Sequence, residues 1–262
     1  MSTPVWLRGI AVAGLAVLVL PLAGMLTRVR WSTLGEDLLS PTTLQALWLS
    51  LLTAACSTLA CLVLGFPLAL VIARASARLA AVLRAAVMVP LVLPPMVGGL
   101  ALLSLLGRSG VVGRPIFEAT GLSLPYTTAG VVVAQTFVAM PFLVITLEGV
   151  LRTSGQGHEW VAASLGANRW RVLTRVTLPL VAPGLVAGTV LAFARAMGEF
   201  GATALFAGNS QGITRTMPLA IYTAYNGVGV SQDSALALSL LLLISAIVIV
   251  AGLRSWREEA VR

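Results

Sequence analysis

Six long apolar runs, separated by short stretches that hold most of the charged residues, constrain this chain more than any other feature. They lie at 7–26, 43–73, 85–106, 127–151, 176–200 and 234–253. Each reaches the roughly 20 residues that a helix needs to cross a bilayer. With 58% hydrophobic and 10% charged residues, the chain is too apolar for a soluble core. We therefore predict an all-α membrane protein with six transmembrane helices and a single domain, residues 1–262.

The basic residues decide which kinds of chemistry the chain can perform alone. All 17 are arginines, and the net charge is +8. Without lysine the chain has neither a P-loop lysine nor a Schiff-base lysine, so any nucleotide chemistry must reside in another chain. The arginines flank apolar runs, which favours a lipid bilayer over nucleic acid as the partner. The only histidine, His158, lies in a loop, so we expect no catalytic site, no metal and no cofactor.

The distribution of arginines predicts the topology. They are concentrated in the connections 74–84 and 152–175 and at the two chain ends, and they are sparser in the other loops. Six crossings place both termini on one side, and the positive-inside rule makes that side cytoplasmic. A further apolar run, 217–225, is too short to cross and is expected to be re-entrant or interfacial.

The third run contains helix-breaking residues at membrane depth, namely Pro94, Pro95, Gly98 and Gly99. Prolines remove backbone hydrogen bonds, and the freed carbonyls must face protein or a water-filled path. We therefore consider two interpretations: part of a translocation path or gate, or a kink packed against neighbouring helices.

Small residues recur at every fourth position of the fifth run, as Gly184, Gly188, Ala192 and Ala196. This spacing leaves one face of a helix almost bare. Such a face either packs closely against another helix or lines a smooth pore.

Charges also occur inside this fifth run. Arg195 and Glu199 are one helical turn apart, and Gly198 and Gly201 flank the glutamate. The two charges can neutralise each other and reach toward the membrane surface. Alternatively, the arginine attracts an anion while the glycines expose N–H groups, which would place Arg195, Gly198, Glu199 and Gly201 at a path or gate.

The loop 152–175 is the one internal segment that looks suited to contact a partner in water. Ala162, Ala163 and Gly166 offer little side chain, so a partner surface can approach the backbone closely, and arginines follow. Pro179 then begins the next apolar run, where a helix tolerates proline. An ordinary cytoplasmic loop is the alternative.

The spacing in this loop is similar to a known motif. Gly166, nine intervening residues and then Val176, Thr177, Leu178 and Pro179 resemble the EAA loop of bacterial ABC importer permeases. The resemblance implies a short cytoplasmic coupling helix that docks on a separate ATPase subunit, where ATP is hydrolysed. It assigns coupling to Glu159, Ala162, Ala163, Gly166 and Pro179, although Glu159 stands one position before the acidic position of that motif.

A second resemblance is more specific. The segments ARAMGEFGATALFAGN (194–209), TRTMPLAIY (214–222) and ALALSLLLL (235–243) look like the permease subunit of molybdate ABC importers. This implies a homodimer with the path at its interface, two cytoplasmic ATPases and an external binding protein that delivers a tetrahedral oxyanion, all at a bacterial inner membrane. Molybdate and tungstate are not distinguished at this level.

Two alternatives remain open at this point. Sulfate and thiosulfate permeases share a similar GEFGA segment. A channel or secondary carrier without an ATPase would instead need ion-coupling carboxylates inside the bundle, whereas Glu148 and Glu199 lie near the ends of their runs. The sequence therefore favours an ATP-driven permease over a stand-alone carrier.

Overall fold

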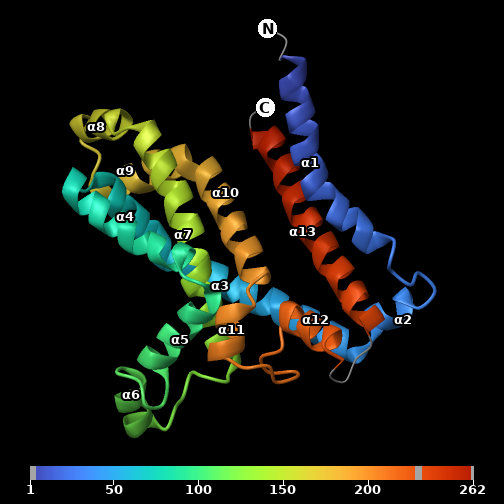
Figure 1. Ribbon diagram of the computed structural model, residues 1–262. Helices are drawn as coiled ribbons and strands as arrows, with labels where there is room; N and C mark the ends of the chain where they lie inside the picture. Colours follow the sequence, from blue (N-terminus) through green and yellow to red (C-terminus); the bar gives the residue numbers. More distant parts are fainter. Residues whose placement is uncertain (1–3, 228–231, 261–262) are drawn as a thin grey trace.

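The protein is described by a computed structural model that covers residues 4–227 and 232–260, in which the regular elements are all helical (Figure 1). Its helices are α1 (Val5–Leu26), α2 (Leu34–Leu39), α3 (Pro41–Arg74), α4 (Ala77–Val92), α5 (Pro95–Leu106), α6 (Gly113–Thr120), α7 (Thr128–Ser154), α8 (Gly157–Ser164), α9 (Arg169–Val172), the π-helical turn η1 (Leu173–Thr177), α10 (Leu178–Met197), α11 (Gly201–Phe206), α12 (Met217–Tyr225) and α13 (Gln232–Ala260).

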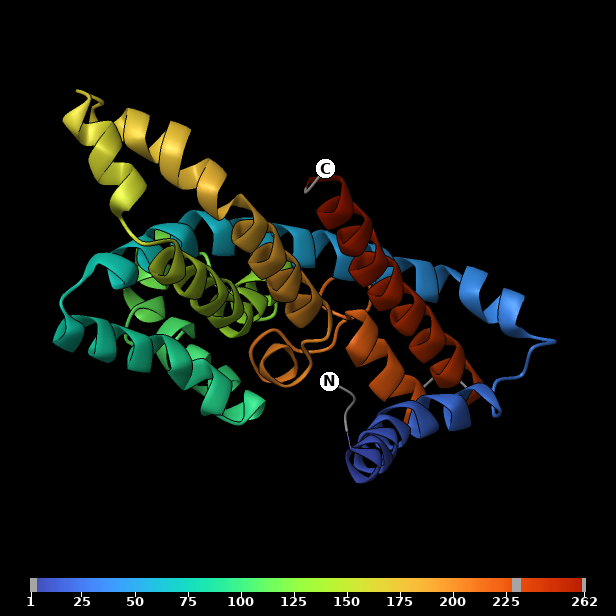
Figure 2. The same cartoon turned by 90° about the horizontal axis from the view of Figure 1, so that it is seen from above.

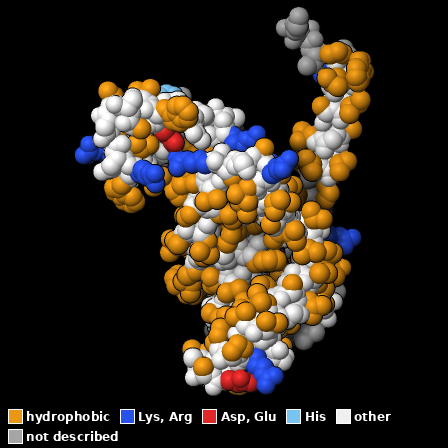
Figure 3. All heavy atoms as spheres, turned by 90° about the vertical axis from the view of Figure 1, so that its left-hand side faces the viewer, with side chains coloured by type: hydrophobic (Ala, Val, Ile, Leu, Met, Phe, Trp, Pro, Cys, Tyr) orange, Lys and Arg blue, Asp and Glu red, His pale blue; other side chains and the backbone are white. Residues whose placement is uncertain are grey.

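Four helical segments of the described chain are long and apolar enough to cross a membrane. They are Trp6–Leu26, Pro41–Arg74, Thr128–Ser154 and the continuous run Arg169–Met197, and α4 with α5 adds a fifth if the two count as one span. Helix α13 covers the last expected range, 234–253, although the side chains of residue 246 and of residues from 249 onward lie outside the described part. The protein is therefore a multi-pass, all-helical membrane protein, and most charged side chains lie toward its two ends (Figure 3).

The third expected range, 85–106, is not one helix. Helix α4 begins earlier, at Ala77, and α5 leaves it at an angle of 112°. Leu93 and Pro94 between them are extended, with ψ angles of 136° and 134°. A proline disfavours the helical conformation of the residue before it. Pro94 acts in this way on Leu93, and Pro95 acts on Pro94, so the helix cannot continue through this doublet. The bend of 112° between α4 and α5 is far sharper than the kink that was one of the two interpretations of these prolines.

Helix α7 forms the centre of the bundle, between α3, α4 and α10 (Figure 2). In the most apolar 18-residue stretch of α7, 61% of the residues are buried, whereas no residue is buried in the corresponding stretch of α1. Leu143 and Leu147 on α7 are fully buried. Because α7 contacts so many helices, it fixes the position of the others.

The small-residue face of α10 packs against α7. Gly184, Gly188, Ala192 and Ala196 are all buried. A Cβ atom on Gly184 would lie 2.5 Å from Val150 Cγ2, and one on Gly188 would lie 3.1 Å from Leu143 Cδ1. The interpretation of this face as close helix packing is confirmed, and the interpretation as a pore lining is wrong, because α7 covers the face.

The first turn of α1, the last turn of α13 and helix α8 are at the same end of the molecule (Figure 1). Helices α5, α6 and α11 lie toward the opposite end. The protein thus has one end that carries α8, which we call the α8 end, and an opposite end that carries α5 and α6.

Candidate functional site

The loop 152–175 contains a short helix, α8, which ends at Ser164, two residues before Gly166. This glycine has a φ angle of +85°, a conformation that residues with a Cβ rarely adopt. The N–H groups of Gly166 and Ala167 donate to the carbonyls of Ala163 and Ala162, each at 3.0 Å. Such hydrogen bonds close the last turn of a helix. Gly166, which we expected at a partner contact, therefore also determines where α8 stops.

Large apolar side chains on and just after α8 are exposed to an unusual degree. Trp160, Val161, Leu165 and Trp170 are between 60% and 83% exposed, and we call them the α8 patch. Ala163 is exposed and Ala162 is half-buried beside them. Sequence reasoning about small residues missed this patch, although two tryptophans and a leucine within an arginine-rich loop were a signal.

Arginines surround the α8 patch. Arg169 lies between Leu165 and Trp170 in the sequence, Arg171 and Arg175 follow Trp170, and all three arginines are exposed. Figure 3 shows the projecting α8 end with basic and apolar side chains side by side. An exposed apolar patch with a charged rim is typical of a surface that binds another protein.

Glu159 does not point toward a partner. Its Oε1 accepts hydrogen bonds from Arg74 Nη2 at 2.8 Å and from Thr177 Oγ1 at 2.6 Å. Its side chain is only 16% exposed. Glu159 therefore connects α8 to the end of α3 and to η1, and it can take part in coupling only by positioning α8. Neither Arg74 nor Thr177 was expected to contribute.

Pro179 lies in the first turn of α10, as expected, but α9 and η1 precede α10 without a break, so the helical run is continuous. The run Arg169–Met197 includes the π-helical turn η1, which ends at Thr177. A proline in a helix removes one backbone hydrogen bond and clashes with the carbonyl four residues earlier, here that of Arg175. The wider turn of η1 lies at this position, and we attribute the π-helical geometry to Pro179.

The two expected groups of path or gate residues meet each other. A Cβ on Gly201 would lie 2.7 Å from Pro95 Cβ, and one on Gly99 would lie 2.9 Å from the carbonyl oxygen of Ala202. The first turns of α5 and α11 therefore touch through their backbones, and we call this the α5–α11 contact. Gly98 packs on the ring of Phe137 beside it. Pro94 precedes the contact and is exposed, as is Gly198.

Arg195 and Glu199 form an ion pair, with Nη2 and Oε2 2.6 Å apart. The helix ends at Met197, so Glu199 lies beyond it, and its side chain is 1% exposed. Its other oxygen accepts the backbone N–H of Ala202 at 2.8 Å. The pair is thus neutralised as one interpretation predicted, but the glutamate is buried and does not reach outward. This geometry does not favour Arg195 as a free anion-binding cation.

The α8 end and the α5–α11 contact are joined by one helical run. Its 29 residues, Arg169–Met197, are about 44 Å long at 1.5 Å per residue. Glu159 contacts the run near its beginning, through Thr177, and Glu199 follows its end. The run thus spans most of the distance between α8 and the α5–α11 contact, and only residues 198–200 separate it from α11.

These features define a class: an integral membrane protein with an exposed apolar patch on a short helix at one end and close backbone contacts between α5 and α11 toward the other. Among the residues that the structure describes, no group of three or more His, Cys, Asp or Glu side chains could hold a metal ion. The chain belongs to the family of binding-protein-dependent transport system inner membrane components, which its residues 64–257 match.

Within this family, the chain is similar in sequence to individual permease proteins of known type. The molybdenum transport system permease protein ModB of Mycobacterium bovis is 51% identical over 95% of this chain and 93% of its own length. The ModB protein of Escherichia coli K12 is 39% identical over 73% of this chain and 83% of its own. The sulfate transport system permease protein CysT of the same bacterium is 34% identical, covering 87% and 85%. The expected resemblance to molybdate permeases is confirmed.

Solved structures show the same fold at low identity. In the crystal structure of a bacterial ABC transporter involved in the import of the polysaccharide alginate, one chain matches with a TM-score of 0.70. The match covers 97% of this chain and 96% of that one, at 18% identity. The helices therefore follow the fold of an ABC importer permease.

Proposed function

We propose that this chain is the permease subunit of an ATP-driven importer for molybdate or tungstate. The observation that carries the proposal is 51% identity to a molybdenum permease over 95% of the chain. The permease forms the translocation path and performs no covalent chemistry. ATP is hydrolysed in a partner chain.

The assembly that we propose contains two copies of this chain, two cytoplasmic ATPase subunits and an extracytoplasmic binding protein for the oxyanion. Membership of a binding-protein-dependent family supports the binding protein. The exposed α8 patch with its arginine rim supports an ATPase contact on α8, which then acts as the coupling helix. Six crossings, with both termini cytoplasmic in a bacterial inner membrane, complete the arrangement.

Coupling in this proposal proceeds through rigid parts. ATP-driven closure of the ATPases moves α8 through Ala162, Ala163 and the α8 patch. Glu159 makes α3 and η1 follow α8, because it hydrogen-bonds Arg74 and Thr177. The run that ends at Met197 then shifts Gly201 against Pro95, which opens or closes the α5–α11 contact.

A sulfate or thiosulfate permease is the second candidate, favoured by the 34% identity to a sulfate permease over 87% of the chain. The test is uptake of labelled molybdate into vesicles that hold this chain with its ATPase and binding protein. We expect excess tungstate, but not excess sulfate, to suppress uptake. Suppression by sulfate would move the assignment to the sulfate branch, and uptake that needs no ATP would contradict the ATP-driven mechanism itself.

A further inference from the structure

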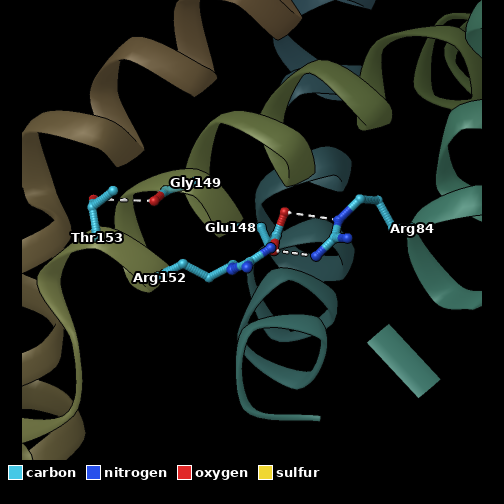
Figure 4. Close-up of polar contacts among 5 residues, drawn as sticks. All are labelled: Arg84, Glu148, Gly149, Arg152 and Thr153. Carbon is cyan, nitrogen blue, oxygen red and sulfur yellow. Dashed lines mark hydrogen bonds and ion pairs between the residues drawn. The ribbon is translucent and has the colours of Figure 1, made fainter. Parts of the chain in front are cut away.

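Two arginines share one buried carboxylate between α4 and α7 (Figure 4). Arg84 Nη2 and Nε donate to Glu148 Oε1 and Oε2 at 2.8 and 3.3 Å. Arg152 Nη1 lies 3.5 Å from the same Oε1. The side chain of Glu148 is 7% exposed, that of Arg84 33% and that of Arg152 59%. One carboxylate can neutralise only one guanidinium, so the cluster keeps a net charge of +1.

A cavity of about 360 Å³ lies against this cluster. Its wall is formed by the end of α3, the turn to α4 and the first turns of α4, together with Arg152 of α7, and it includes both arginines but no acidic residue. The residues that line the cavity are Ile72, Ala73, Ala75, Ala77, Ala80, Arg84 and Arg152. Its volume is in the range of cavities that hold small molecules. The short alanine side chains leave the two guanidinium groups as the only charged groups that meet a ligand there.

Donors for a ligand remain in the cluster. Within the described residues, Arg84 Nη1 and the Nε and Nη2 groups of Arg152 make no hydrogen bond or ion pair. Glu148 holds Arg84 in place through two hydrogen bonds, so the free edge of that guanidinium has a defined direction. Two planar guanidinium groups offer paired donors, which suit the oxygens of a phosphate.

The location adds a second argument. The cavity lies at the α8 end, between the last residues of α3 and the first turns of α4. Glu148 and Arg152 are on the last two turns of α7, so the cluster lies near the depth at which a bilayer has its headgroup phosphates. Basic pockets between helices at this depth bind anionic headgroups.

We propose that the cavity between α4 and α7 binds a tetrahedral phosphate-type group through Arg84 and Arg152. Its source is the headgroup of an anionic lipid or a free inorganic anion. The site lies apart from the α5–α11 contact and does not depend on which ion the protein transports. Its occupant bridges the α3–α4 turn to α7 and thereby fixes α4, which begins at that turn.

The test uses the full chain in nanodiscs of phosphatidylcholine, with or without phosphatidylglycerol, and counts retained lipid by native mass spectrometry. For a lipid ligand we expect preferential retention of phosphatidylglycerol, reduced roughly fivefold by Arg152→Gln. For a free ligand we expect inorganic phosphate, without phosphatidylglycerol, to raise the thermal unfolding midpoint of the normal protein but not of the variant. Either pattern supports the site and identifies the source.

Arg78→Gln is the matched control, because Arg78 is an exposed arginine on α4, the helix that carries Arg84, but is outside the cavity lining. Removing Arg84 alone would leave Glu148 buried without its main partner and could unfold the protein. The double variant Arg84→Gln, Glu148→Gln avoids this and should also lose the bound anion. Equal losses in Arg78→Gln and Arg152→Gln, or no effect of either phosphatidylglycerol or phosphate, would overturn the proposal.

Discussion

At the scale of single residues, one carboxylate joins three parts of the chain. Glu159 accepts hydrogen bonds from Arg74, 85 residues earlier in the sequence, and from Thr177, 18 residues later. The Arg74 side chain is 43% exposed, whereas Thr177 is 1% exposed. The two bonds therefore differ in energy, because water can replace Glu159 at Arg74 but not at Thr177.

We expect Glu159→Ala to destabilise the protein more than Arg74→Ala does. Losing an exposed ion pair costs about 0.2 to 1 kcal/mol, whereas an unpaired buried hydroxyl costs about 1 to 3 kcal/mol. Denaturant unfolding of the purified protein measures both. Thr177→Val removes the need for the acceptor and should rescue part of the Glu159→Ala loss. Equal effects of the two single variants would show that the bond to Thr177 contributes nothing.

The glycines of the α5–α11 contact give a second prediction at this scale. A Cβ on Gly201 would be 2.7 Å from Pro95 Cβ, whereas one on Gly198 would meet only the Ala194 oxygen, at 3.6 Å. Gly201→Ala should therefore force the two helices apart, at a cost of about 1 to 3 kcal/mol. Gly198→Ala is the control and should change the unfolding free energy little. Transport in vesicles should fall only in the first variant.

Single-residue patterns predicted these positions but not their partners. The doublet Pro94–Pro95 indicated a break in the helix, and the two glycines that flank Glu199 indicated a backbone that is not regular helix. That Gly99 packs on Ala202 could not be predicted, because the contact depends on the 112° bend between α4 and α5. Likewise, nothing in the sequence around Glu159 indicates that Arg74 occupies its carboxylate.

At the scale of elements, α8 combines a helix of small residues with a large apolar surface. The resemblance of this loop to the EAA loop implied a short helix, and α8 forms just before Gly166. The identity of its contact surface depends on which faces the rest of the chain leaves exposed. Only the fold shows that Leu165 is 83% exposed and that Glu159 points inward.

Leu165→Glu should prevent the ATPase from binding. The residue follows α8 and is 83% exposed, so a charge there should not affect folding but should be poorly tolerated in an apolar contact. We expect at least a tenfold loss of co-purified ATPase subunit, equivalent to about 1.4 kcal/mol. A bulky residue at Gly166 would be a poorer test, because its φ of +85° would strain any side chain.

Val111→Glu is the control for this experiment. Val111 is 82% exposed and follows α5, in the part of the molecule opposite the α8 end. It should leave co-purification of the ATPase unchanged. If Leu165→Glu retains the ATPase as well as Val111→Glu does, the α8 patch is not the docking surface.

At the scale of the whole molecule, the fold and the charges indicate the same orientation. The first turn of α1, the last turn of α13 and α8 lie at one end (Figure 1). The connection between α3 and α4, with Arg74 and Arg78, is in the same half. Most of the arginine-rich connections thus lie at one end, and by the positive-inside rule this distribution supports our proposal that this end is cytoplasmic.

Labelling of single cysteines tests this orientation in intact cells. Cys56 is exposed, so it is first replaced by serine together with Cys61. We then expect Ser164→Cys on α8 to resist a membrane-impermeant maleimide until the cells are opened, and Ser109→Cys, after α5, to react at once. Both positions are exposed, so a lack of reaction reports topology and not burial. Cysteines at the chain ends should behave like Ser164→Cys if both termini are cytoplasmic. A terminus that reacts like Ser109→Cys would lie on the side of the membrane opposite α8. The chain would then cross the membrane an odd number of times between that terminus and α8, which would contradict the six-helix arrangement.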